Sequence, residues 1–279
     1  MKNMKLSCSL FCMVFVCALT LSTAVTAQTV SSVNIVGFNR VDIPGNDQLR
    51  LVAPVFLNGS NTVTNTVFTL DALLGTNNLT ANWDSSHASV VYLWIDFTYK
   101  AVWLNDGGWS NPDVDYKWCY DNGGTPVACA GTYDVALGSG FWLKTRGSST
   151  NTLFSGDVVA APTMEVGLSN GLCLIANPYS VGQNLDDMIS TNDGAVANWN
   201  SSMSDGVYIW NNGTYLTAWL NDGAWSDPNI DFRWCYDNGG IPVPCVSNDL
   251  YKIDAGEGFW YKRRGSSTNW IADRPYSVD

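Results

Sequence analysis

Short apolar segments alternate with turn-forming residues along most of this chain. Each segment is rich in aromatic and β-branched side chains and is bounded by Asn, Asp, Gly or Pro, as antiparallel strands are. The clearest segments are residues 90–95, 100–104, 116–120 and 140–144. Dipeptides between segments, such as Asp106-Gly107 and Asn122-Gly123, accept the positive φ angles that tight hairpin turns require. The pattern therefore predicts a sheet of short strands.

Helical patterns are scarce. Only residues 69–74 and 184–190 resemble one or two helical turns, and each follows a strand segment rich in leucine. The fold class expected from this balance is all-β.

The chain also contains an internal duplication. Residues 105–129 match residues 221–245 at 17 of 25 positions without a gap, and shorter matches continue on both sides. A period above about 100 residues is too long for a solenoid, so each copy should be a domain or half-domain. We expect two tandem homologous antiparallel modules, β-sandwich or barrel-like, over residues 28–150 and 151–279.

Tryptophan positions are kept between the two copies. Of 13 tryptophans, six in the first copy have a counterpart in the second, and Trp270 alone is unmatched. The pairs are Trp83 and Trp199, Trp94 and Trp210, Trp103 and Trp219, Trp109 and Trp225, Trp118 and Trp234, and Trp142 and Trp260. The pairs within strand patterns, such as Trp94 and Trp210, are expected in the core.

Residues 1–27 have the order of a secretory signal peptide. Lys2 and Lys5 precede an apolar run over residues 10–21, and small residues follow up to Ala27. We predict cleavage before Gln28 and a secreted protein, extracellular or in the cell envelope. No later apolar run is long enough for a membrane span.

Charge narrows the range of partners. The chain has 14 basic and 25 acidic residues, and loss of the two signal lysines leaves 12 against 25, a net charge of −13. Nucleic acid is therefore not expected as a partner, because its phosphates require a basic surface.

Five cysteines remain after signal removal, and four of them are repeated. Cys119 and Cys129, like Cys235 and Cys245, flank a Tyr-Asp-Asn-Gly-Gly turn. This spacing predicts the disulfides Cys119–Cys129 and Cys235–Cys245 in an oxidising compartment, with Trp118 and Trp234 packed over them. A zinc site is the competing interpretation, but His87 is the only histidine and there is no CxxC spacing.

Cys173 has no counterpart, because the first copy has Arg50 at that position. We expect a buried free thiol, and an intermolecular bridge is the alternative.

Catalytic motifs are weak. His87 is replaced by Met203 in the second copy, and no nucleophilic serine motif is present. Asp106, Asp113, Asp115 and Asp121 could supply the two carboxylates of a glycoside hydrolase. An enzyme is therefore an alternative rather than the first hypothesis.

The loop over residues 105–115, repeated at 221–231, carries the main functional hypothesis. An exposed tryptophan beside carboxylates and amides can stack on a sugar ring and hydrogen-bond its hydroxyls. The predicted ligand-binding residues are Trp109, Asn105, Asp106 and Asp115, with Trp225, Asn221, Asp222 and Asp231. Packing of Trp109 and Trp225 in the core is the alternative. No cofactor is required, although calcium could use the same aspartates.

Several short motifs occur in one order along the chain. They are Val33-Asn34-Ile35-Val36-Gly37-Phe38, residues 172–179, Val207-Tyr208-Ile209-Trp210 and Ala255-Gly256-Glu257-Gly258-Phe259-Trp260. Together they resemble poorly characterised repeat β modules of bacterial secreted and surface proteins. The resemblance implies export and an envelope or extracellular role, and it supplies no catalytic residue.

The leading hypothesis is a secreted, non-enzymatic binding protein whose partner is a polysaccharide or glycan surface. The first alternative is a structural matrix or surface protein that self-associates through its aromatic faces. The second alternative is the aspartate-based glycoside hydrolase.

Overall fold

The computed structural model describes residues 36–57, 66–76 and 78–277. The predicted signal peptide, residues 1–27, lies outside the described residues. Within the described part of the chain, no helix has the length and hydrophobicity needed to cross a membrane.

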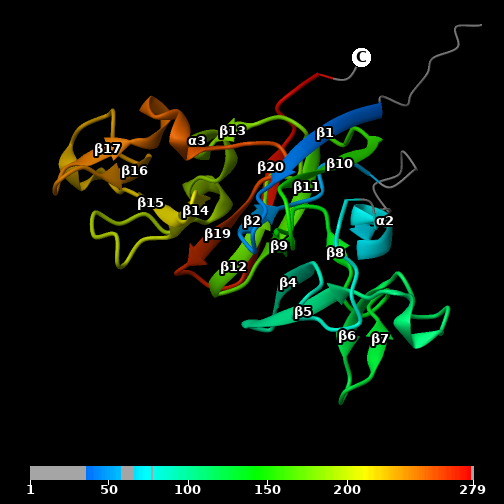
Figure 1. Cartoon of the computed structure of the whole chain (residues 1–279). Helices are drawn as coiled ribbons and strands as arrows, with labels where there is room; N and C mark the ends of the chain where they lie inside the picture. Colours follow the sequence, from blue (N-terminus) through cyan, green and yellow to red (C-terminus); the bar gives the residue numbers. More distant parts are fainter. Residues whose placement is uncertain (1–35, 58–65, 77, 278–279) are drawn as a thin grey trace, which may run out of the picture. The chain divides into compact units, whose positions relative to one another are not determined.

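Two six-stranded antiparallel sheets dominate the fold (Figure 1). The sheet of the first half has the order β2 (Leu49–Val52), β9 (Phe141–Lys144), β4 (Val90–Ile95), β5 (Thr98–Leu104), β6 (Trp118–Asp121) and β7 (Pro126–Ala128). The sheet of the second half has the matching order β12 (Gly171–Ala176), β19 (Gly258–Arg263), β14 (Gly206–Asn211), β15 (Thr214–Leu220), β16 (Trp234–Asp237) and β17 (Pro242–Pro244). The predicted all-β fold with two similar halves is confirmed.

Two-stranded ribbons complete each half. The first half has β1 (Val36–Ile43) paired with β10 (Thr150–Asp157), and β3 (Val67–Phe68) paired with β8 (Val135–Ala136). The second half has β11 (Thr163–Leu168) with β20 (Thr268–Asp273), and β13 (Gln183–Asn184) with β18 (Lys252–Ile253).

One two-stranded ribbon crosses the predicted boundary after residue 150. Strand β10 pairs with β1 over its whole length, so it completes the first half. The second half begins with β11, and residues 158–162 connect the two. The sequence pattern did not reveal this because the two strands of the ribbon lie over 100 residues apart in the chain.

Short helices form where they were predicted. They are α2 (Leu70–Leu74) and α3 (Leu185–Met188), with single 3-10 turns at η1 (Gly107–Trp109), η2 (Thr191–Asp193), η3 (Gly223–Trp225), η4 (Cys245–Ser247) and η5 (Asp249–Tyr251). Asp71 of α2 accepts a hydrogen bond from the Trp118 backbone N–H, 3.0 Å, and Asp186 of α3 accepts the equivalent bond from Trp234, 2.8 Å. The same contact therefore holds each helix on its sheet.

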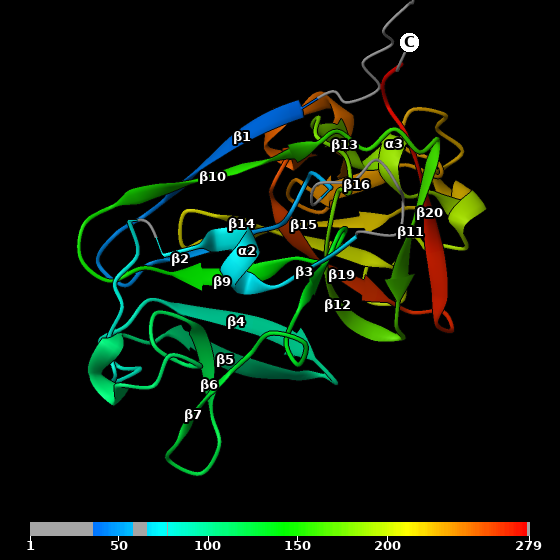
Figure 2. The same ribbon diagram turned by 90° about the vertical axis from the view of Figure 1, so that its right-hand side faces the viewer.

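The two halves meet through reciprocal aromatic pairs. The Trp94 and Trp260 rings lie 5.0 Å apart edge-to-face, and Trp142 and Trp210 lie 5.3 Å apart in the same way. Leu51 joins this cluster from β2 and Leu174 from β12. Figures 1 and 2 both show β2 and β9 beside β12 and β19. The tryptophans expected in strand cores therefore join the two halves.

The predicted disulfides are wrong, because all five described cysteines are free thiols. Cys119 pairs across the ladder with Ala128, while the Cys129 N–H donates to the Trp118 carbonyl, 2.9 Å. Partners across a ladder share one face and successive residues alternate, so Cys119 and Cys129 point to opposite faces. Cys119 accordingly packs with Trp103, and Cys129 packs with Trp118.

The second half repeats this arrangement, with Cys235 opposite Pro244. Trp118 and Trp234 are completely buried, but they cover core side chains rather than cystines. Cys173 is a buried free thiol, as predicted.

Candidate functional site

Each half carries the same loop around one turn of 3-10 helix. In the first half Asp106 caps η1, and its Oδ1 accepts from the Gly108 N–H at 2.8 Å. In the second half Asp222 caps η3, and its Oδ1 accepts from the Ala224 N–H at 2.9 Å. Part of each predicted ligand-binding carboxylate is thus used to shape the loop, and each residue is only half-buried.

Buried asparagines close the base of both loops. The Asn105 N–H donates to the Lys117 carbonyl at 2.9 Å, and its Nδ2 donates to the Val114 carbonyl at 3.0 Å. Asn221 makes the equivalent bonds, with Nδ2 donating to Ile230 at 3.0 Å. Both asparagines are fully buried, so their prediction as surface ligand contacts is corrected: they hold the loop.

Three aromatic side chains stand exposed around each loop. We call Trp83, Trp109 and Tyr116 the first aromatic surface, and Trp199, Trp225 and Phe232 the second aromatic surface. Their exposed fractions run from 43% to 62%. Trp109 and Trp225 are therefore exposed, as the binding hypothesis requires, and the core alternative for them is excluded.

A glycine at the start of each 3-10 turn makes room for one aromatic side chain of each surface. A Cβ on Gly107 would lie 3.0 Å from the Tyr116 ring, and a Cβ on Gly108 would lie 3.6 Å from Cβ of Trp83. In the second half a Cβ on Gly223 would lie 3.1 Å from the Phe232 ring. The absence of a side chain at Gly107 and Gly223 lets the Tyr116 and Phe232 rings lie directly against the helical turn. The distance at Gly108 is an ordinary contact, and the second half has Ala224 at that position.

The backbone is strained at the same aromatic residue in both halves. Tyr116 and Phe232 each have a φ of 57°, in the left-handed region. Bulky side chains rarely adopt this conformation, which costs of order 1–3 kcal/mol. The cost is present twice, on side chains whose rings face solvent.

The loops also bury the same unpartnered polar atoms. In the first half these atoms are Trp103 Nε1, Asn105 Oδ1 and Asp115 Oδ1, and in the second half Trp219 Nε1, Asn221 Oδ1 and Asp231 Oδ1. Buried polar atoms usually have partners, and exceptions concentrate at functional sites. Asp115 and Asp231 are half-buried, so each reaches the surface only in part.

Sequence reasoning identified only one residue of each aromatic surface. Trp83 and Trp199 were recognised as a repeated pair but given no role, and Tyr116 was assigned to a strand. The available signal was the constant spacing: each residue recurs 116 positions later, with aromatic character kept at Tyr116 and Phe232.

Two of the four aspartates considered for hydrolysis, Asp106 and Asp121, serve as turn caps. Asp121 Oδ1 accepts from the Gly124 N–H at 2.7 Å, as Asp106 does from Gly108. Asp113 is exposed. Over residues 36–57, 66–76 and 78–277, no group of three or more His, Cys, Asp or Glu side chains is placed to hold a metal ion.

His87 does not form a catalytic relay. Ser86 Oγ at 3.0 Å and Asp84 Oδ2 at 3.1 Å both contact the same ring nitrogen, Nδ1. A relay needs the nucleophile and the acid on different nitrogens. These side chains instead form an exposed turn.

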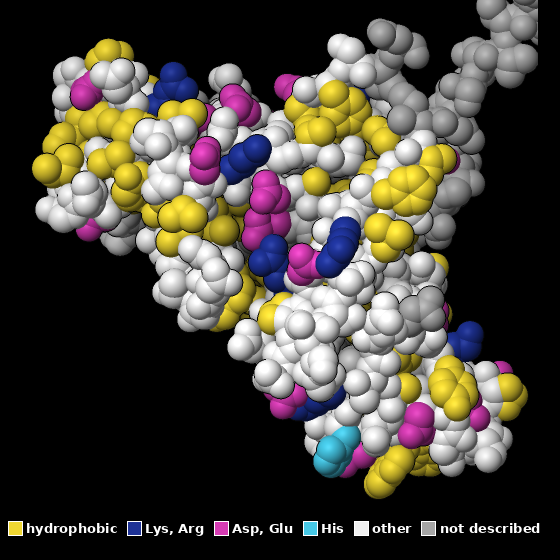
Figure 3. All heavy atoms as spheres, turned by 45° about the horizontal axis from the view of Figure 1, so that its top comes forward, with side chains coloured by type: hydrophobic (Ala, Val, Ile, Leu, Met, Phe, Trp, Pro, Cys, Tyr) yellow, Lys and Arg dark blue, Asp and Glu magenta, His cyan; other side chains and the backbone are white. Residues whose placement is uncertain are grey.

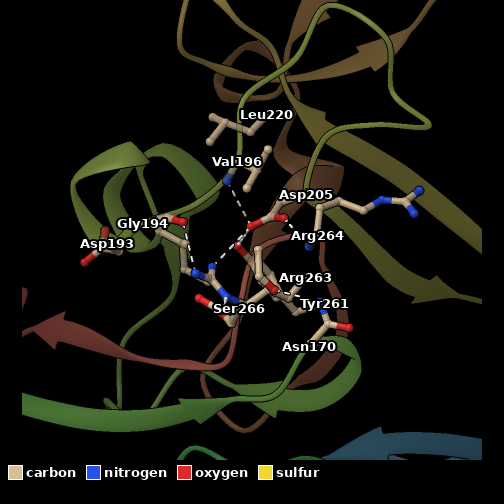
Figure 4. Close-up of polar contacts among 12 residues, drawn as sticks. Asn170, Asp193, Gly194, Val196, Asp205, Leu220, Tyr261, Arg263, Arg264 and Ser266 are labelled. Atoms are coloured by element: carbon tan, nitrogen blue, oxygen red, sulfur yellow. Dashed lines mark hydrogen bonds and ion pairs between the residues drawn. The ribbon is translucent and has the colours of Figure 1, made fainter.

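The densest polar network is structural (Figure 4). Asp205 is fully buried and accepts from Tyr261 Oη at 2.6 Å and from the Arg264 N–H at 2.6 Å. Arg263 Nη1 lies 3.4 Å from the same carboxylate. Because both charged groups are enclosed, they do not meet a ligand at the surface.

No family model, curated protein or solved structure matches this chain. The chemistry of the two aromatic surfaces is therefore the basis for a functional assignment.

Proposed function

We propose that this is a secreted, non-enzymatic carbohydrate-binding protein with one site in each half. The observation that supports this proposal is the repeated set of three exposed aromatic side chains around a strained, capped loop. Large adjacent apolar side chains on a surface favour a binding role over a purely structural one. Both halves also carry two features that lower stability: an aromatic residue in the left-handed region, and buried polar atoms without a partner. Unfavourable features of this kind are expected at functional sites, so they favour the same role.

The chemistry of the site suits a sugar. The rings of Trp109 and Trp83 offer flat faces for the C–H side of a pyranose. Asp106, half-buried beside them, offers a carboxylate for hydroxyl groups. Trp225, Trp199 and Asp222 offer the same groups in the second half. Two sites on one chain would raise the avidity for a polymer without any new contact.

A polysaccharide retention assay tests the proposal. We expect the mature protein to be retained on at least one insoluble polysaccharide and its Trp109→Ala, Trp225→Ala variant to lose at least about tenfold in affinity, the value of a stacked ring. The matched control is Phe38→Ala, because Phe38 is 70% exposed on β1 and lies outside both aromatic surfaces.

Two results would overturn the proposal. The first is no retention on any polysaccharide, with or without calcium. The second is equal retention of the tryptophan variant and the Phe38 control. Concentration-dependent self-association that is lost in the tryptophan variant would instead support the structural alternative.

A further inference from the structure

A groove lined by both polar and apolar side chains lies apart from the two aromatic surfaces. It has a volume of about 920 Å³ and is lined by β1, by β2 with the segment leading into it, by the start of β10, and by the end of β14 with the turn that follows. Its lining includes Arg40, Asp42, Arg50, Asn151 and Trp210. A neighbouring hollow of about 550 Å³ shares Arg40, Asp42 and Arg50 and adds Glu257. Figure 3 shows charged side chains of both signs gathered near the centre of one face.

Arg50 stands out in this groove because its hydrogen-bonding capacity is unused. Its Nε is buried and has no partner. The nearest carboxylate oxygen, Glu257 Oε1, lies 3.8 Å from Arg50 Nη2, which is too long for a hydrogen bond. Within the described residues the Arg50 side chain donates no hydrogen bond. The Arg50 guanidinium, with five donors, is therefore within ion-pair distance of Glu257 but has no acceptor at hydrogen-bonding distance.

The other charges of the groove are already paired. Arg40 Nε lies 3.0 Å from Asp42 Oδ1, and Asp47 lies 2.6 Å from Arg146. Arg50 is thus the cation with the greatest capacity for a further anion. A guanidinium matches a carboxylate in a planar, two-bond geometry, which makes a carboxylate its best partner.

The second half lacks this cation. Position 50 corresponds to Cys173, a buried thiol, so the groove has no duplicate. Trp210 supplies an aromatic ring to the same groove, and Gln48, Asn151 and Asn212 supply amides. A guanidinium, an aromatic ring and several amides together suit a sugar that carries a carboxylate.

We infer that this groove binds a uronic acid residue, with its carboxylate on Arg50 and its ring beside Trp210. The site is separate from the aromatic surfaces, so it stands or falls independently of the proposed function. The overall negative charge does not oppose this, because charges are screened beyond about 8 Å at 0.15 M salt and the local groove decides.

Calorimetric titration of the mature protein at 0.15 M salt tests the inference, with trigalacturonate as probe and neutral maltotriose as comparison. We expect trigalacturonate to bind and maltotriose to bind at least about tenfold more weakly. Arg50→Gln should weaken trigalacturonate binding by at least about tenfold, and Glu257→Gln should tighten it by removing the competing carboxylate. The matched control is Lys100→Gln, which removes one positive charge on β5 outside the groove.

A further variant guards against misfolding. Arg50→Lys keeps the charge but loses the two-bond geometry, and it should also weaken binding. Trp109→Ala, Trp225→Ala should bind trigalacturonate as the wild type does. The inference is overturned if trigalacturonate does not bind, if both trisaccharides bind equally, or if Arg50→Gln behaves like Lys100→Gln. Loss of binding in the tryptophan variant would also overturn it, by placing the uronate on the aromatic surfaces.

Discussion

The two halves make the same strand connection with different side chains. In the second half the Val196 N–H donates to Asp205 Oδ2 at 3.1 Å; in the first half the Thr80 N–H donates to the hydroxyl of Ser89 at 3.0 Å. The surrounding backbone bonds are the same in both halves. A hydroxyl therefore suffices for this strand connection, which does not require the charge of Asp205.

The neighbours of this position also differ between the two halves. Asp205 contacts Tyr261 and Arg263, whereas the first half has Leu143 and Thr145 at the corresponding positions. Buried charges must be paired, so one carboxylate requires a guanidinium and several donors. The comparison teaches that the ion pair is not required by the fold, although within the second half its members depend on each other.

The largest expected effect on stability comes from breaking the ion pair between Asp205 and Arg263. Arg263→Ala leaves Asp205 buried without its cation and should lower the free energy of unfolding by about 3–5 kcal/mol. The triple change Asp205→Ser, Tyr261→Leu, Arg263→Thr copies the first half and should cost no more than about half of that. Urea unfolding followed by circular dichroism measures both. A triple variant as unstable as Arg263→Ala would show that the halves are not interchangeable here.

The reactivity of the buried cysteines tests a feature that the two halves share. Burial, with nearby aspartates, raises the pKa of Cys119, Cys129 and Cys235 to about 12. Since the thiolate is the reactive form, these thiols should react with dithiobis-nitrobenzoate at pH 8 about a hundredfold more slowly in the folded protein than after unfolding.

The same assay counts the thiols. The unfolded mature protein should show five, because the structure has five free cysteines. A count of one would restore both disulfides and contradict the register of β6 with β7 and β16 with β17.

Glu257 has no acidic counterpart, because Ser139 occupies its position in the first half. Burial raises the pKa of Glu257, although Arg50 opposes this. A raised pKa means that the folded state binds the proton more tightly, so this contribution to stability is present at acid pH. It is lost as the pH rises from the unfolded pKa through the folded one. Glu257→Gln should therefore gain stability relative to wild type between pH 4 and 7, measured by thermal unfolding. The reverse trend would mean that Arg50 outweighs burial.

The smallest effect concerns the strained aromatic residues. Asparagine tolerates the left-handed region, so Tyr116→Asn and Phe232→Asn should each raise stability by up to about 1 kcal/mol. Both rings are mostly exposed, so little burial is lost. The same changes should weaken polysaccharide retention. Destabilisation by more than 1 kcal/mol would show that the rings support the loop rather than a ligand. Phe38→Asn, at an extended position, is the control.

Local patterns predicted much of the fold. Strand segments such as residues 90–95, the short helices and the duplication follow from neighbouring residues and from a repeat visible in one chain. The turn-rich loop around Trp109 was also recognised from its sequence, but its exposure was left open between sugar stacking and core packing. Trp83 and Tyr116 were missed because they come from separate segments that only the folded chain brings to Gly107 and Gly108.

The sequence by itself determined the all-β composition, the two equivalent halves and the repeated Trp109 and Trp225 loops, because periodicity and turn chemistry act over a few residues. Only the tertiary structure decided the rest. Ladder register put Cys119 and Cys129 on opposite faces, and the pairing of β10 with β1 set the limit of the first half. Asn105 is buried, so it holds the loop instead of contacting a ligand. Packing also leaves Arg50 Nε without an acceptor in its groove. Each of these depends on which distant residues become neighbours, which local patterns do not specify.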